Sequence, residues 1–111
     1  MGGFRVTIRR RGGTERSRCD DLAGALELLE LRLRDLGSGL RRDTERAFVR
    51  DVEPVQQVAL RGEISGPRGL RAGVDVRGDG SAEAFTGRVV RRLVEQRPGE
   101  DAYAALRRAL A

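Results

Sequence analysis

Polar and apolar side chains alternate at the start of the chain, and this pattern predicts two paired strands. The alternation covers residues 4–9 and has the period of two that is typical of a strand with one buried face. The glycine pair at 12–13 can supply the positive φ of a tight turn. Residues 14–19 are therefore expected to return as an antiparallel partner, with Arg16 and Arg18 on one face of the hairpin.

Leucines at helical spacing predict a helix over residues 21–36. Asp20 or Asp21 can cap its first turn, and Gly37 is expected to end it. The apolar stripe consists of Leu22, Ala25, Leu26, Leu29, Leu33 and Leu36. A stripe on one side predicts that this helix packs against a sheet and leaves its other side in solvent.

Later in the chain, alternation predicts two more strands, over residues 58–64 and 70–76, each followed by a glycine-rich turn. Residues 38–53 fit a short helix or the approach to a strand equally well. Residues 82–96 fit either a helix with Gly87 in its interior or a long strand bent at the same glycine. Their β-branched side chains favour the strand.

An amphipathic pattern over residues 100–110 predicts a second helix at the end of the chain. The predicted order of elements is therefore ββαβββα. A chain of 111 residues is about one ordinary domain, so residues 1–111 are expected to form a single domain. These elements predict an α+β fold with a largely antiparallel sheet of about five strands and two amphipathic helices packed on one face.

The composition removes much of the usual catalytic chemistry. All 22 basic residues are arginine, and histidine, the side chain most used for proton transfer near neutral pH, is absent. Cys19 is the only cysteine, and the charges of Asp20 and Asp21 beside it disfavour a thiolate, so a structural role is expected. We expect no enzyme, no metal site and no cofactor. Catalysis by Cys19 or by paired carboxylates is the third hypothesis.

The chain has no apolar run of the about 20 residues that a membrane span needs. It also shows no charged segment leading into an apolar stretch, which is the pattern of a secretory signal. Because its single cysteine cannot form an internal disulfide, a reducing compartment suits the chain. We therefore expect a cytoplasmic protein that does not act at a membrane.

The net charge of +5 is concentrated at the amino end, where residues 1–19 contain six arginines and one glutamate. If alternate residues of the hairpin share a face, the arginines form a basic stripe that can neutralise phosphates. The candidate nucleic-acid-binding residues are Arg5, Arg9, Arg11, Arg16 and Arg18, with Arg11 at the tip. A solvated or internally salt-bridged face is the simpler interpretation, and aromatic side chains for stacking on bases are scarce. Nucleic-acid binding is thus the alternative hypothesis.

Two leucines of the first predicted helix lie outside its apolar stripe, Leu28 at the margin and Leu31 opposite the centre. Beside Arg32 they would form a small apolar patch of the kind found at partner surfaces and dimer contacts. The candidate partner-binding residues are Leu28, Leu31 and Arg32. The favoured hypothesis is a small non-enzymatic binding or assembly module that contacts another protein or another copy of itself.

Overall fold

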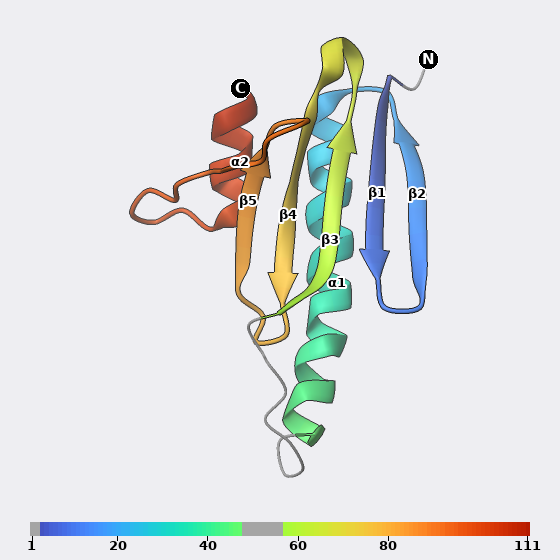
Figure 1. Ribbon diagram of the computed structural model, residues 1–111, viewed down its shortest axis with the longest axis vertical. Helices are drawn as coiled ribbons and strands as arrows, with labels where there is room; N and C mark the ends of the chain where they lie inside the picture. Colours follow the sequence, from blue (N-terminus) through green and yellow to red (C-terminus); the bar gives the residue numbers. More distant parts are fainter. Residues whose placement is uncertain (1–2, 48–56) are drawn as a thin grey trace.

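The computed structural model describes residues 3–47 and 57–111, with the backbone alone described for residues 40–47. Its elements follow one another in the order shown in Figure 1. They are β1 (Phe4–Arg10), β2 (Gly13–Cys19), α1 (Leu22–Ala47), β3 (Val58–Ser65), a short 3₁₀ turn (Pro67–Gly69), β4 (Arg71–Arg77), β5 (Ala82–Thr86), β6 (Arg92–Leu93) and α2 (Ala102–Leu110). The predicted α+β fold is confirmed, with a sixth short strand added to the expected five.

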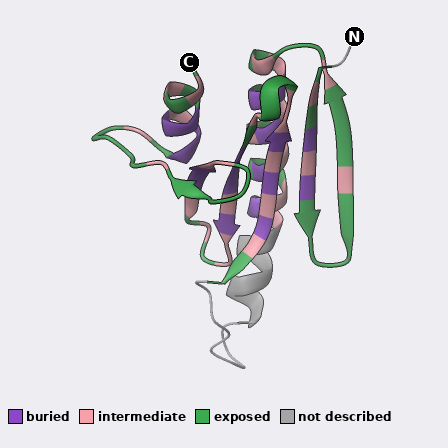
Figure 2. Cartoon of the chain, turned by 45° about the horizontal axis from the view of Figure 1, so that its top comes forward, coloured by how far each residue is buried: buried purple, intermediate pink, exposed green. Residues whose placement is uncertain are grey.

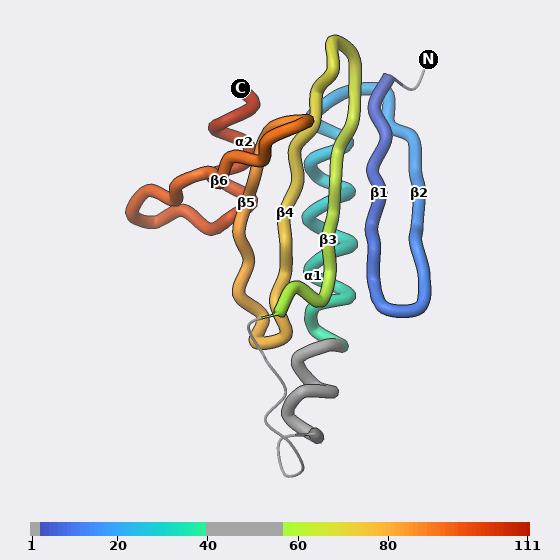
Figure 3. The backbone as a smooth tube through the Cα atoms, viewed as in Figure 1, coloured from blue at the N-terminus to red at the C-terminus, as the bar shows by residue number. Residues whose placement is uncertain are grey.

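All six strands form one antiparallel sheet in the order β2-β1-β3-β4-β5-β6. Short turns join strands that are neighbours in the sheet, with one exception. β1 and β3 pair with each other, although β2 and α1 lie between them in the sequence. Helix α1 covers β1 and β3, and α2 covers β4 and β5 on the same side of the sheet (Figures 1 and 3). The opposite side, called here the outer face, is not covered by either helix.

The hydrophobic core lies between the sheet and the two helices. Alternation places every second strand residue toward the helices, as the sequence pattern predicts. These residues are Val6, Ile8, Leu60, Ile64, Ala72, Val74, Val76 and Ala84. They pack against Ala25, Leu26, Leu29 and Leu33 of α1 and against Ala102, Tyr103 and Leu106 of α2. Figure 2 shows this buried layer and the mostly exposed β2 beside it.

Two glycines allow close packing on opposite faces of the sheet. A Cβ atom on Gly62 would meet the side chains of Leu29 and Leu33, so the missing side chain lets α1 lie close to β3. On the outer face, a Cβ atom on Gly73 would meet the ring of Phe85. Phe85 is only 3% exposed although it lies on the face without helices.

The predicted end of the first helix at Gly37 is wrong. Asp21 caps the helix as expected, because its Oδ1 accepts a hydrogen bond from the Gly24 backbone at 2.7 Å. The helix then continues through Gly37 to Ala47. Gly37 is buried within the helix, and a Cβ atom there would make only an ordinary contact with Val76, so this position does not require glycine to end the helix or to allow close packing. Of the undecided residues 38–53, those up to 47 are helical, and the rest lie outside the described residues.

For residues 82–96 the strand interpretation is confirmed over β5, and the helix interpretation is wrong. The long bent strand is also wrong, because the chain reverses at Gly87, where φ is +113°, and returns as β6. A Cβ atom at this position would meet the carbonyl group of Val90, so the turn requires glycine. Leu93 then pairs with Phe85 across the two strands.

Candidate functional site

Register places most of the charged strand residues of the sheet together on the outer face. Because side chains alternate along each strand, the residues opposite one another in neighbouring strands share this face. The outer face contains seven arginines and three carboxylates, namely Arg5 and Arg9 of β1, Arg16 and Arg18 of β2, Arg61 and Glu63 of β3, Arg71, Asp75 and Arg77 of β4, and Glu83 of β5. The charges of this face divide into a paired and an unpaired region.

Arginines in the centre of the outer face are paired with carboxylates. Arg61 donates two hydrogen bonds to Asp75, from Nε at 2.6 Å and from Nη2 at 3.0 Å. This forked geometry is the strongest that guanidinium and carboxylate form, and it raises the pKa of Arg61. Arg77 donates to Glu83 at 3.0 Å on the neighbouring strands. These pairs hold β3, β4 and β5 together across their outer side.

Glu63 is the carboxylate that most arginines approach. Its oxygens lie 3.0 Å from Arg9 and 3.4 Å from Arg71, and Arg91 approaches it at 3.9 Å. The side chain of Glu63 is only 12% exposed, so these cations replace water around it. Arg9, a candidate for nucleic-acid contact, is therefore occupied by an ion pair within the protein.

The hairpin end of the outer face has arginines without carboxylates. We call Arg5, Arg16 and Arg18 the hairpin arginine cluster. Within the described residues, none of the three forms a salt bridge or a side-chain hydrogen bond, although Arg9 on the same hairpin does. Arg11 lies in the turn between β1 and β2, as predicted, and is likewise unpaired there. The structure thus places four of the five candidate arginines on one face, where Arg9 differs from the other three because it is paired with Glu63, and it places Arg11 in the turn.

Arg5 and Arg18 are direct cross-strand partners, which places two like charges opposite one another. Ser65 stands opposite Arg5 on the other neighbouring strand. Together with Phe4 and Gly66, these residues line a hollow of about 300 Å³. Two unpaired guanidinium groups and a hydroxyl beside a hollow are suited to binding an anion, because an anion relieves their mutual repulsion.

The other candidate surface, Leu28, Leu31 and Arg32, is partly used by the fold. Leu28 is half-buried and packs against the core. Arg32 donates two hydrogen bonds to Glu15 of β2, at 2.8 and 3.1 Å, and a third to Asp35. Leu31 remains 65% exposed, so it is the member of the three that stands free for a partner.

An exposed apolar segment on the outer face escaped the sequence analysis. Val89 and Val90, on the turn between β5 and β6, and Leu93 of β6 are exposed, and this segment crosses the outer face in Figures 1 and 2. Arg91 of this turn lies 4.5 Å from the ring centre of Phe85 and holds it in place. The sequence around Val89 predicted one continuous strand. The reversal at Gly87 places Val89 on a turn instead.

The third hypothesis, catalysis, concerns Cys19 and the carboxylates. Cys19 packs against the core, and burial together with Asp20 and Asp21 raises the pKa of its thiol. In the part of the chain that the structure describes, no cluster of metal-ligating side chains is found. Neither described helix combines the length and the apolar character needed to cross a bilayer.

Comparison with known proteins does not assign the chain to a family. No family model matches the chain, and no curated protein or solved structure matches it either. The function therefore has to be argued from the surfaces described above.

Proposed function

We propose that this protein is a non-enzymatic binding module that takes an acidic segment of a partner protein on the hairpin arginine cluster. The observation that supports this proposal most directly is that Arg5, Arg16 and Arg18 lie together on one face without a carboxylate among the described residues. Arginines elsewhere on the same face have such partners. A carboxylate-rich segment would supply what the hairpin lacks.

The edge position of β2 suits an extended partner. β2 is the first strand in the sheet order, so one of its sides faces no other strand of the described chain. Such an edge can pair with an added strand, whose backbone supplies affinity while its side chains supply specificity. A segment with carboxylates at every second position would place them beside Arg16 and Arg18, which are two residues apart.

A second copy of the protein fits this edge less well than an acidic segment does. Antiparallel pairing of β2 with itself would place the arginines of one copy against those of the other. Like charges at cross-strand positions destabilise a pair. The charge of β2 therefore selects against self-pairing at this edge.

Nucleic acid is the alternative occupant of the same cluster. Unpaired arginines favour it, but an extended phosphate backbone would run from the cluster onto the centre of the outer face, where the arginines are already paired with Glu63, Asp75 and Glu83. The outer face of the hairpin also presents threonines between its arginines, with no aromatic side chain for base stacking. These features favour a short acidic peptide over a nucleic acid.

Fluorescence anisotropy tests the proposal with a labelled peptide of about ten residues that alternates glutamate and valine. We expect saturable binding that weakens about tenfold in the variant Arg16→Gln/Arg18→Gln, since hydrogen bonds to charged groups contribute about 1.5–3 kcal/mol. The matched control is Arg88→Gln/Arg97→Gln, which lowers the net charge equally outside the hairpin and should bind as the wild type does. A peptide with glutamine in place of glutamate should not bind.

The same assay with single-stranded and duplex DNA separates the alternatives. If DNA binds more tightly than the peptide, and log affinity falls steeply with log salt, the nucleic-acid hypothesis replaces the protein hypothesis. Equal binding of the peptide by both double variants would contradict the assignment to the hairpin arginine cluster.

Leu31 offers a second place for protein contact, because it is a large apolar side chain exposed on α1. Self-association there would appear in sedimentation velocity as a rise in the sedimentation coefficient with concentration. The variant Leu31→Glu should abolish that rise, whereas Leu93→Glu should not. If the protein is a monomer at every concentration, the hypothesis of self-association through α1 is wrong. The proposal for the hairpin arginine cluster does not depend on this result.

A further inference from the structure

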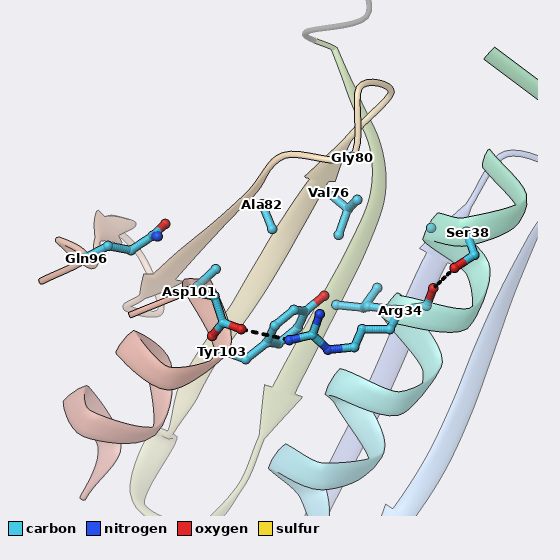
Figure 4. Close-up of a pocket in the computed structure, with 11 residues that line it drawn as sticks. Arg34, Ser38, Val76, Gly80, Ala82, Gln96, Asp101 and Tyr103 are labelled. Atoms are coloured by element: carbon cyan, nitrogen blue, oxygen red, sulfur yellow. Dashed lines mark hydrogen bonds and ion pairs between the residues drawn. The ribbon is translucent and has the colours of Figure 1, made fainter. Parts of the chain in front are cut away.

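A cleft between the two helices lies on the side of the sheet opposite the hairpin arginine cluster. It has a volume of about 360 Å³, within the range of small-molecule sites. Its apolar walls come from both helices and from β4 and β5, namely Leu33, Gly37, Val76, Ala82 and Ala102. Polar side chains stand around it, with Arg34 and Tyr103 the most prominent (Figure 4).

The hydroxyl group of Tyr103 is a hydrogen-bond donor that faces this cleft. Tyr103 is only 7% exposed, and Figure 4 shows its hydroxyl directed away from α2 into the space in front of Val76. Within the described residues the hydroxyl forms no hydrogen bond. No buried side-chain oxygen or nitrogen of the described residues lacks a partner, so this hydroxyl is open to water from the cleft and can donate to a molecule that displaces that water. Burial also raises the pKa of Tyr103 to about 12, so the phenol stays protonated and can donate.

Arg34 closes one side of the cleft without leaving an unbalanced charge there. Its guanidinium group lies 4.7 Å from the ring centre of Tyr103. Nε donates to Glu30 and Nη2 donates to Asp101, both at 2.7 Å. Hydrogen bonds from the backbone N–H of Ala104 and from Arg34 lower the pKa of Asp101, so its carboxylate is ionised near neutral pH. Because Arg107 also pairs with Glu30, two cations face two carboxylates at this wall.

We propose that the cleft binds a small uncharged molecule with one acceptor oxygen and a short carbon skeleton, such as a ketone or an ester. The acceptor oxygen receives the hydrogen bond of the Tyr103 hydroxyl, and the carbon skeleton lies against Val76, Ala82 and Leu33. Arg34 and Asp101 are the charged residues that line the cleft, and they are paired with each other, so a charged molecule of the same size would find no unpaired counter-charge there and is disfavoured.

NMR titration with three molecules of similar size tests this proposal, namely cyclohexanone, cyclohexanecarboxylate and cyclohexylamine. Tyr103 is the only tyrosine and the chain has no tryptophan, so its ring signals report on the cleft without overlap. Cyclohexanone at millimolar concentration should shift these signals and the amide signals of Gly37 and Gly80 in a saturable manner. The two charged molecules should bind more weakly.

Two variants locate the binding. Tyr103→Phe keeps the ring but removes the donor, so the affinity for cyclohexanone should fall about threefold to tenfold, the effect of one hydrogen bond. Ala82→Leu fills the cleft and should abolish binding, while Leu93→Ala, outside the cleft, should not change it. Amide spectra confirm that each variant is folded. Absence of saturable shifts in the wild type, unchanged affinity in Tyr103→Phe, or tighter binding of either charged molecule would overturn the proposal.

Discussion

The two ends of the outer face place the same residue type in different electrostatic settings. In the centre, Arg61 is joined to Asp75 by two hydrogen bonds, and Glu63 is approached by several arginines. At the hairpin, Arg5 and Arg18 stand opposite one another with no carboxylate from the described chain. The comparison shows that an arginine on a sheet face can serve the fold or remain available to a partner.

The centre of the outer face and the hairpin also differ in how their side chains pack. The centre has its own small apolar layer, in which Phe85 lies against Gly73 and beneath Arg61 and Arg91. The hairpin has no such layer, and β2 is exposed along most of its length (Figure 2). Substitutions in the centre should therefore change stability, whereas substitutions at the hairpin should change binding.

The largest effect is expected at Phe85. Removing this buried ring in Phe85→Ala should lower the free energy of unfolding by about 3–5 kcal/mol, because the ring's contacts are lost and a cavity remains. Its cross-strand partner Leu93 is 68% exposed, so Leu93→Ala should change stability by less than about 0.5 kcal/mol. Urea unfolding of both variants measures the difference. Equal losses would mean that the outer face has no packed centre.

Glu63→Gln is expected to have the next largest effect on stability. It removes a carboxylate from the centre of the outer face, so that arginines there lose their partner and resemble those of the hairpin. Loss of the carboxylate that Arg9 and Arg71 contact should lower the free energy of unfolding by about 1–3 kcal/mol. The released arginines should also strengthen binding of the glutamate-valine peptide. Glu27→Gln, at an exposed position on α1 without an ion pair among the described residues, controls for the change in net charge. Weaker peptide binding in Glu63→Gln would contradict the comparison.

Much of the fold could be predicted from the sequence because most elements depend on local pattern. The alternation over β1 and β3 and the leucine stripe of α1 identified these elements and their buried faces. Gly37 misled the prediction because a glycine can end a helix or stand in the interior of one. Gly37 lies inside the helix beside Val76, a residue far away in the sequence, so local pattern could not decide between the two.

The candidate site could be predicted only in part, because pairing of charges depends on strand register. The sequence placed the arginines of the hairpin on one face, but it could not show that Glu63 would stand opposite Thr7 and beside Arg9. It also could not place Ser65 next to Arg5. Register between distant strands is set by the whole sheet, so the division of the arginines into paired and unpaired groups appears only in three dimensions.

Paired and unpaired arginines can also be compared on β2 through the pH dependence of stability, because the two faces of this strand differ in ion pairing. Glu15 on the helix side is hydrogen-bonded to Arg32, and this interaction lowers the pKa of Glu15 below its ordinary value of 4.5. A carboxylate with a lowered pKa in the folded state stabilises the fold above its unfolded pKa, and that contribution is lost as the pH falls through the folded value. Glu100, beside Arg108, behaves in the same way.

Stability should therefore decline as the pH falls below about 4.5, and the decline should be smaller in Arg32→Gln, which removes the partner of Glu15. Arg16→Gln, on the other face of the same strand, should leave the acid profile unchanged. Urea unfolding between about pH 7 and about pH 2 measures both. An acid profile that Arg16→Gln flattens as much as Arg32→Gln would show that Arg16 has a carboxylate partner.

The smallest effect on stability is expected at the hairpin itself. Arg18→Gln removes a charge opposite Arg5 and breaks no ion pair among the described residues, so the free energy of unfolding should stay within about 0.5 kcal/mol or rise slightly. Arg61→Gln is the matched change in the centre, and it should lower stability by about 1–2 kcal/mol because Asp75 loses both hydrogen bonds. Urea unfolding at low and high salt separates the two cases, since salt screens the repulsion between Arg5 and Arg18. High salt should therefore reduce any gain from Arg18→Gln. A clear loss of stability in Arg18→Gln would mean that this arginine serves the fold, and the hairpin would then lose its distinction from the centre.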